Sequence, residues 1–87
     1  MASFKILFKK SVEKDLRGID RTQIIKILMA IEKLAFSPFP SNSRQLVGGY
    51  KTFRLRVGNY RVIYFINEIT STIEVQRIAH RRDVYRN

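Results

Sequence analysis

The sequence predicts an α+β fold in which one strand and two helices precede a three-stranded antiparallel meander. Two amphipathic patterns lead to this prediction. Apolar residues recur at steps of three and four between residues 24 and 35, which is typical of a helix that buries one side. Apolar and polar residues alternate strictly over residues 52–57, as in a strand with one covered face. The 87 residues suffice for one domain, 1–87, with helices packed on one face of its sheet.

The first half of the chain is expected to hold one strand and both helices. Residues 4–8 are apolar enough for a short strand. Ser11 can cap a first helix that runs to about Arg17. A second helix is expected to start after Asp20, whose side chain can cap it, and to end before Pro38.

The second half of the chain has the composition of a meander. Gly58-Asn59 is a two-residue turn with glycine first, as a type II′ hairpin prefers. The strand after this turn is apolar on both faces except at Arg61, which indicates a central position in the sheet. The strands are expected over residues 52–57, 60–66 and 72–79, after a linker at 41–50.

Charge indicates the class of partner. Seventeen Lys and Arg residues and seven Asp and Glu residues give a net charge of +10, which attracts polyanions. The segment from Arg44 to Asn67 has no acidic residue. Arginine binds phosphate through a two-pronged guanidinium, so this segment is the expected nucleic-acid surface. Its basic residues are Arg44, Lys51, Arg54, Arg56 and Arg61.

Several functional classes find no support in the composition. The chain has no cysteine and one histidine, and its seven carboxylates are scattered, so no metal site and no cofactor are expected. No apolar run is long enough for a signal peptide or a membrane span. We therefore expect a cytoplasmic protein without a membrane partner.

Arg61 allows two interpretations. An arginine in an otherwise apolar central strand is costly unless it is paired or partly exposed. It could form an ion pair with Glu68 or Glu74 across the sheet, or it could bind a phosphate. Residue chemistry leaves both open.

The polar tail brings acid–base groups and arginines together. His80, Arg81, Arg82 and Tyr85 follow the last predicted strand. RNA cleavage requires that a 2′-hydroxyl lose a proton, that charge on the phosphorus be stabilised, and that the leaving 5′-oxygen gain a proton. A solvated histidine and a packing tyrosine are the simpler interpretation of these residues.

Three segments together resemble the RelE branch of the RelE/ParE toxin superfamily: Leu46–Tyr50, Phe53–Tyr64 and Ile78–Arg86. The resemblance implies a metal-independent endoribonuclease, an mRNA interferase that enters the ribosomal A site, cuts the message and inhibits translation. It also implies a cognate antitoxin that neutralises the toxin and that can bind operator DNA.

By position, the resemblance also implies site residues. A basic position of the family falls on Thr52 here, which leaves the general base unassigned, with Lys51 and His80 as substitutes. The expected catalytic residues are Arg54, Arg61, His80, Arg81 and Tyr85. The expected RNA-binding residues are Lys51, Arg56, Arg82 and Arg86.

Two other functions remain open at this point. A ParE-like protein would share the fold and inhibit DNA gyrase without cutting RNA. A catalytically inactive relative would bind nucleic acid or antitoxin only. The combination of Arg61, Arg81 and Tyr85 favours the nuclease, because the ParE branch generally lacks this set.

Overall fold

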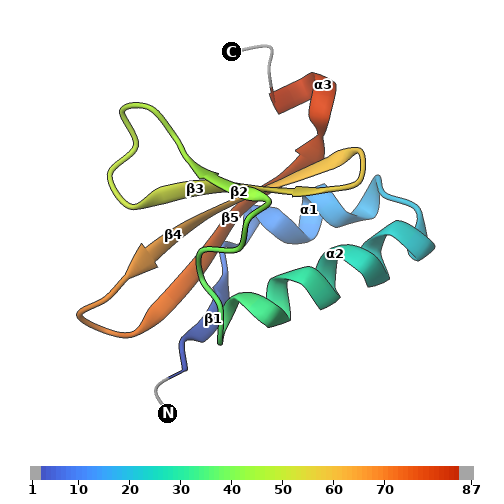
Figure 1. Cartoon of the computed structure of the whole chain (residues 1–87). Helices are drawn as coiled ribbons and strands as arrows, with labels where there is room; N and C mark the ends of the chain where they lie inside the picture. Colours follow the sequence, from blue (N-terminus) through green and yellow to red (C-terminus); the bar gives the residue numbers. More distant parts are fainter. Residues whose placement is uncertain (1–2, 85–87) are drawn as a thin grey trace.

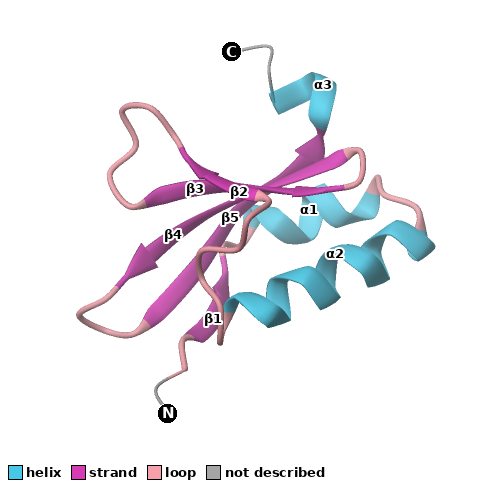
Figure 2. Ribbon diagram, viewed as in Figure 1, coloured by secondary structure: helices cyan, strands magenta, loops and turns pink. Residues whose placement is uncertain are grey.

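The computed structural model describes residues 3–84 and shows a five-stranded sheet with two helices on one face (Figure 1 and Figure 2). The α+β class and the order of strand, two helices and meander are as predicted. The elements are β1 (Lys5–Phe8), α1 (Ser11–Arg17), α2 (Arg21–Leu34), β2 (Ser43–Gln45), β3 (Thr52–Val57), β4 (Tyr60–Asn67), β5 (Thr72–His80) and α3 (Arg81–Val84).

The sheet is larger than the predicted meander. Its strand order is β1-β5-β4-β3-β2, and β4 is central, as predicted from its apolar faces. β1 pairs in parallel with β5, so the sheet is mixed. The linker expected at residues 41–50 was wrong in part, because Ser43–Gln45 pairs antiparallel with β3. β2 satisfies the outer edge of β3, whose peptide groups would otherwise have no partner strand.

The two helices begin differently from each other. Ser11 does not cap α1, because the preceding Lys10 already has helical dihedral angles (φ −55°, ψ −37°). Ser11 is therefore the first residue inside the helix. α2 begins after Asp20 as predicted, but the Asp20 carboxylate makes no capping hydrogen bond. The Asp20 backbone carbonyl accepts hydrogen bonds from the amides of Gln23 and Ile24.

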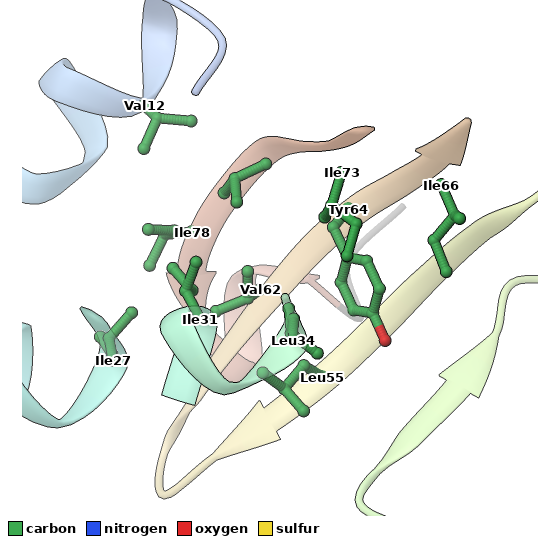
Figure 3. Packing of buried hydrophobic residues seen from close by; sticks show 11 residues of the cluster. Val12, Ile27, Ile31, Leu34, Leu55, Val62, Tyr64, Ile66, Ile73 and Ile78 are labelled. Atoms are coloured by element: carbon green, nitrogen blue, oxygen red, sulfur yellow. The ribbon is translucent and has the colours of Figure 1, made fainter. Parts of the chain in front are cut away.

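The hydrophobic core lies between α1, α2 and one face of the sheet (Figure 3). Leu55, Val62 and Ile78 are neighbours across three strands and are almost fully buried. The faces of β3 are as predicted: Leu55 is buried, and Phe53 and Val57 pack against the same core. The helices contribute Val12, Ile27, Ile31 and Leu34.

One polar group reaches into this core. The Tyr64 ring is fully buried and stacks on Phe53, with 5.7 Å between ring centroids. Its hydroxyl donates to the Pro38 carbonyl at 2.8 Å, which satisfies the buried oxygen. Burial raises the pKa of Tyr64. No helix within residues 3–84 is long and apolar enough to cross a membrane.

Candidate functional site

The sheet face opposite the helices carries two pairs of arginines. Arg44 on β2 lies directly across from Arg54 on β3. Arg56 on β3 lies directly across from Arg61 on β4. Successive side chains of a strand point to opposite faces, so the arginines of β3 and β4 lie away from Leu55 and Val62. Like charges directly opposite each other destabilise a sheet, so the charge repulsion within each pair opposes folding. Their placement instead concentrates positive charge.

These four arginines line one pocket of about 270 Å³. Ser41 and Asn42 complete its lining, and no carboxylate is among the described residues that form it. A concave site with several guanidinium groups and no negative charge strongly favours an anion. A phosphate group, which can accept bidentate hydrogen bonds from arginine, fits this chemistry. We call this pocket the arginine pocket.

Arg61 is buried on the floor of the arginine pocket, with 7% of its surface exposed. Its Nη1 donates to the carbonyls of Gly58 and Tyr60 at 3.0 and 2.9 Å, so the β3–β4 hairpin fixes the guanidinium. The ion pair considered for Arg61 is not formed with either carboxylate. Glu68 accepts a hydrogen bond from the Lys51 ammonium, and Glu74 accepts one from the Gln76 side chain. A cation fixed in advance stabilises an anion without further reorganisation.

Asn42 closes one side of the pocket. Its side-chain Nδ2 donates to the Arg56 backbone carbonyl at 2.7 Å, and its backbone carbonyl accepts a hydrogen bond from the Arg56 backbone amide at 2.9 Å. This reciprocal pair holds residues 41 and 42 beside the end of β3, just before β2 begins. The side chains of Arg56 and Arg44 therefore extend from two segments whose backbones are joined by hydrogen bonds.

Lys51 and Thr52 lie at the other end of β3. The Lys51 ammonium is 2.7 Å from the Glu68 carboxylate. The hydrogen bond to Glu68 and the negative charge of that carboxylate raise the pKa of Lys51, so the amine stays protonated near neutral pH. Thr52 donates its hydroxyl to the Tyr50 carbonyl. Lys51 therefore lacks the properties of a general base, and it does not line the arginine pocket.

His80 lies on the helix-covered side of the sheet. It is the cross-strand partner of Tyr60, and the two rings meet edge to face with centroids 5.5 Å apart. Tyr60 packs against the core. Ala79, and not His80, is the partner of Arg61, so His80 and Arg61 belong to opposite faces. The structure does not bring His80 into the arginine pocket.

α3 places two further predicted residues at the hairpin end of the sheet. The Arg81 amide donates to the Asn59 carbonyl at 2.7 Å, which ties α3 to the β3–β4 hairpin. The Arg82 amide donates to Nδ1 of His80 at 3.3 Å. Arg81 and Arg82 are both exposed. Tyr85 and Arg86, the other predicted residues of the tail, lie outside the described residues.

Sequence reasoning missed three residues of the pocket as site residues: Ser41, Asn42 and Arg44. All three fall in the segment expected to be a linker. The arginine-rich composition after Arg44 was the available signal, but three residues of β2 are too few to reveal a strand period. Across residues 3–84, no three His, Asp or Glu side chains are grouped so as to hold a metal ion.

A family comparison assigns the chain. Residues 6–85 match the family described as the ParE toxin of the type II toxin–antitoxin system parDE. The chain belongs to the RelE/ParE toxin superfamily. Toxin RelE3 of Methanocaldococcus jannaschii is 29% identical over 85 residues, which cover 93% of this chain and 94% of the relative. Toxin RelG of Mycobacterium tuberculosis is 29% identical over 91 residues, which cover 95% and 97%. By family, the chain is a toxin of a type II toxin–antitoxin system.

Solved structures of this superfamily share the fold. The archaeal RelE–RelB complex of Pyrococcus horikoshii contains a chain that superposes with a TM-score of 0.81 at 25% identity, over 91% of this chain and 96% of that chain. The RelB–RelE antitoxin–toxin complex of Methanococcus jannaschii gives a TM-score of 0.76 at 29% identity, over 91% and 94%. Both of these structures are complexes of RelE with RelB, and the second is described as an antitoxin–toxin complex.

Proposed function

We propose that this protein is a ribosome-dependent endoribonuclease that cleaves mRNA in the A site and so inhibits translation. The arginine pocket is the main support. It offers a fixed guanidinium at Arg61, flanked by Arg54 and Arg56, in a concavity that no carboxylate of residues 3–84 lines. Relatives named RelE toxins agree with this assignment.

The proposed reaction is an in-line attack within the RNA. The 2′-oxygen attacks the adjacent phosphorus, the bond from phosphorus to the 5′-oxygen breaks, and the products are a 2′,3′-cyclic phosphate and a free 5′-hydroxyl. Arg54, Arg56 and Arg61 stabilise the charge on the pentavalent phosphorus. Arg81 supplies or orients the proton for the leaving 5′-oxygen, and Tyr85 is the candidate to accept the 2′-hydroxyl proton or to stack on a base. The proposed reaction requires no metal or cofactor.

The general base remains the weakest part of the protein's own machinery. Lys51 is held protonated by Glu68, and His80 belongs to the other face of the sheet. Among residues 3–84, neither candidate base therefore adjoins the anion site, so an external contribution to activating the 2′-hydroxyl is expected. This supports action on the ribosome, where the message itself can be held in the reactive geometry.

We also propose the partners that such a toxin requires. A cognate antitoxin binds and neutralises it in the cytoplasm, as the RelE–RelB complexes of the relatives indicate. Binding to operator DNA then occurs only through the antitoxin. Arg82, Arg86 and Lys51 remain proposed contacts to RNA.

Induced expression with primer extension on cellular messages tests the nuclease. The unaltered protein should stop growth and leave cuts at A-site codons. Arg56→Ala and Arg81→Ala should each reduce cleavage about 100-fold or more, since removing one donor to a developing anion costs roughly that factor. Tyr85→Phe should relieve toxicity with the fold intact.

Arg17 provides a matched control. Its side chain is 74% exposed on α1, where it pairs with Glu13, on the helix-covered side of the sheet. Arg17→Ala removes the same charge without touching the arginine pocket, so cleavage should stay within about twofold. Full toxicity of both the Arg81→Ala and Tyr85→Phe variants would contradict the catalytic assignment.

The description of the matching family favours one second candidate, a ParE-like inhibitor of DNA gyrase. In that case expression would be toxic without cuts in messages, and the purified protein would inhibit supercoiling by gyrase. An inactive relative would show neither toxicity nor cuts. The nuclease alone predicts cuts that depend on Arg56.

A further inference from the structure

The loop of residues 46–51 extends the arginine face beyond the pocket. This loop joins β2 to β3, the strands that carry Arg44 and Arg54. In Figure 1 the loop and α3 rise on the side of the sheet away from α1 and α2, at opposite ends. Arg54 is two residues along β3 from Thr52, a distance of roughly 7 Å. A strand bound in the arginine pocket would reach this loop within a few nucleotides.

The 46–51 loop is closed by backbone hydrogen bonds of its own. Leu46 and Thr52 are joined by a hydrogen bond from the Leu46 amide to the Thr52 carbonyl at 2.8 Å. The amides of Gly49 and Thr52 donate to the carbonyls of Leu46 and Gly49, both at 3.2 Å. Gly48 has φ +79°, a conformation that glycine adopts readily. A side chain at Gly49 would place its Cβ 3.1 Å from that of Thr52. A loop organised in this way loses little entropy on binding.

This loop presents an aromatic ring to solvent. Tyr50 is 79% exposed, although a ring of this size contributes to folding only where it is buried. Lys51 Nζ lies 6.0 Å from the ring centroid and is fixed by its bond to Glu68. Single exposed apolar residues are common on protein surfaces and need no explanation by themselves. Tyr50 differs because it is held beside a cation, on a rigid loop that adjoins an anion pocket.

We propose that Tyr50 is a stacking platform for a nucleobase of the RNA strand whose phosphate occupies the arginine pocket. This inference rests on the proposed function and adds a positioning residue to it. Aromatic rings stack on every base, so the contact fixes the strand without selecting a sequence. No acidic residue lies between Arg44 and Asn67 in the chain, and the carboxylate that reaches the loop, that of Glu68, is paired with the Lys51 ammonium, which offsets its repulsion of a polyanion.

Binding of a fluorescent, uncleavable 2′-O-methyl RNA hexamer, followed by anisotropy at low salt, tests the proposal. One stacked base contributes about 1–3 kcal/mol, so Tyr50→Ala should weaken binding about 5- to 150-fold. Tyr50→Phe keeps the ring and should bind within about twofold of the unaltered protein. Phe36→Ala is the matched control, since Phe36 is 75% exposed beyond the end of α2.

A series of hexamers, each with one abasic position, separates stacking from other effects. One of these positions should weaken binding to the unaltered protein and have little further effect on the Tyr50→Ala variant. Equal binding of Tyr50→Ala and the unaltered protein, or equal losses with every abasic hexamer in both proteins, would overturn the stacking proposal. A loss of antitoxin binding alone in Tyr50→Ala would overturn it also, in favour of a protein contact.

The nuclease is judged separately. If the unaltered protein does not bind the hexamer, the stacking proposal fails, whereas primer extension on ribosomes still decides whether messages are cut. If Arg56→Ala weakens hexamer binding and Tyr50→Ala does not, the arginine pocket binds RNA and only the role of Tyr50 is wrong.

Discussion

The two faces of the sheet are made by alternate residues of the same strands, yet they have different physical tasks. Leu55 and Val62 point into a core sealed by α1 and α2. Their chain neighbours Arg56 and Arg61 line an open pocket on the other side. The covered face gains free energy from buried apolar surface, while the open face accepts repulsion between adjacent cations. In this small domain, binding chemistry is therefore placed one residue away from the core.

Leu55→Ala should have the largest effect on stability. Leu55 is 1% exposed, so its truncation should lower the free energy of unfolding by about 2–5 kcal/mol. That is a large part of the roughly 4–13 kcal/mol expected for a chain of this length. Urea denaturation followed by circular dichroism measures the change.

The adjacent Arg56→Ala is the control for the comparison between the two faces. It should change the free energy of unfolding by no more than about 0.5 kcal/mol, and a gain is possible because repulsion with Arg61 is relieved. Equal destabilisation by the two variants would mean that the open face also supports the fold.

Tyr64→Phe should have a smaller, pH-dependent effect. It removes the hydroxyl that donates to Pro38, which should cost about 1–2 kcal/mol at neutral pH. Burial raises the pKa of Tyr64 in the folded protein, so the contribution of this group is complete below pH 10 and is lost as the pH rises through the folded pKa. Over pH 8–11, the free energies of unfolding of the two proteins should therefore differ by a constant amount up to about pH 10 and approach each other above it. Curves that stay parallel over this range would contradict the assignment.

Glu68→Gln should have a smaller effect on stability than Tyr64→Phe. The Lys51–Glu68 pair is exposed, and water and salt screen such a pair, so it contributes little to stability. The melting temperature should fall by a few degrees at low salt, and the difference should shrink as salt rises. A large loss that persists at high salt would show that the 46–51 loop supports the covered face.

The sequence predicted the parts of the fold that have a clear period. Six alternating residues sufficed for β3, and the apolar stripe of α2 was long enough to identify a helix and its buried side. β2 has only three residues, and the parallel pairing of β1 with β5 joins segments more than 60 residues apart. Neither leaves a local pattern to recognise.

The arginines were easier to predict than their partners. Because side chains alternate along a strand, Arg54 and Arg56 point to the other face of the sheet from Leu55. Arg61 points to the other face from its neighbour Val62 for the same reason. His80 was expected beside these arginines because it follows the last predicted strand. It lies two residues after Ile78, however, so its side chain is on the same face of β5 as that buried residue. This two-residue spacing was present in the sequence and could have placed His80 on the covered face. Gly58-Asn59 predicted the hairpin, but the hydrogen bonds of the Arg61 guanidinium to the Gly58 and Tyr60 carbonyls depend on the side-chain conformation of Arg61, which no residue pattern specifies.

The position of β5 between β1 and β4 also determines when the fold can form. β1 leaves the ribosome early, but its partner, residues 72–80, is among the last strands to be made. Contacts between segments so distant in the chain must wait for the later segment and fold slowly. The sheet therefore stays incomplete until residues 72–80 have been synthesised, and a nascent chain that lacks them cannot assemble its full face.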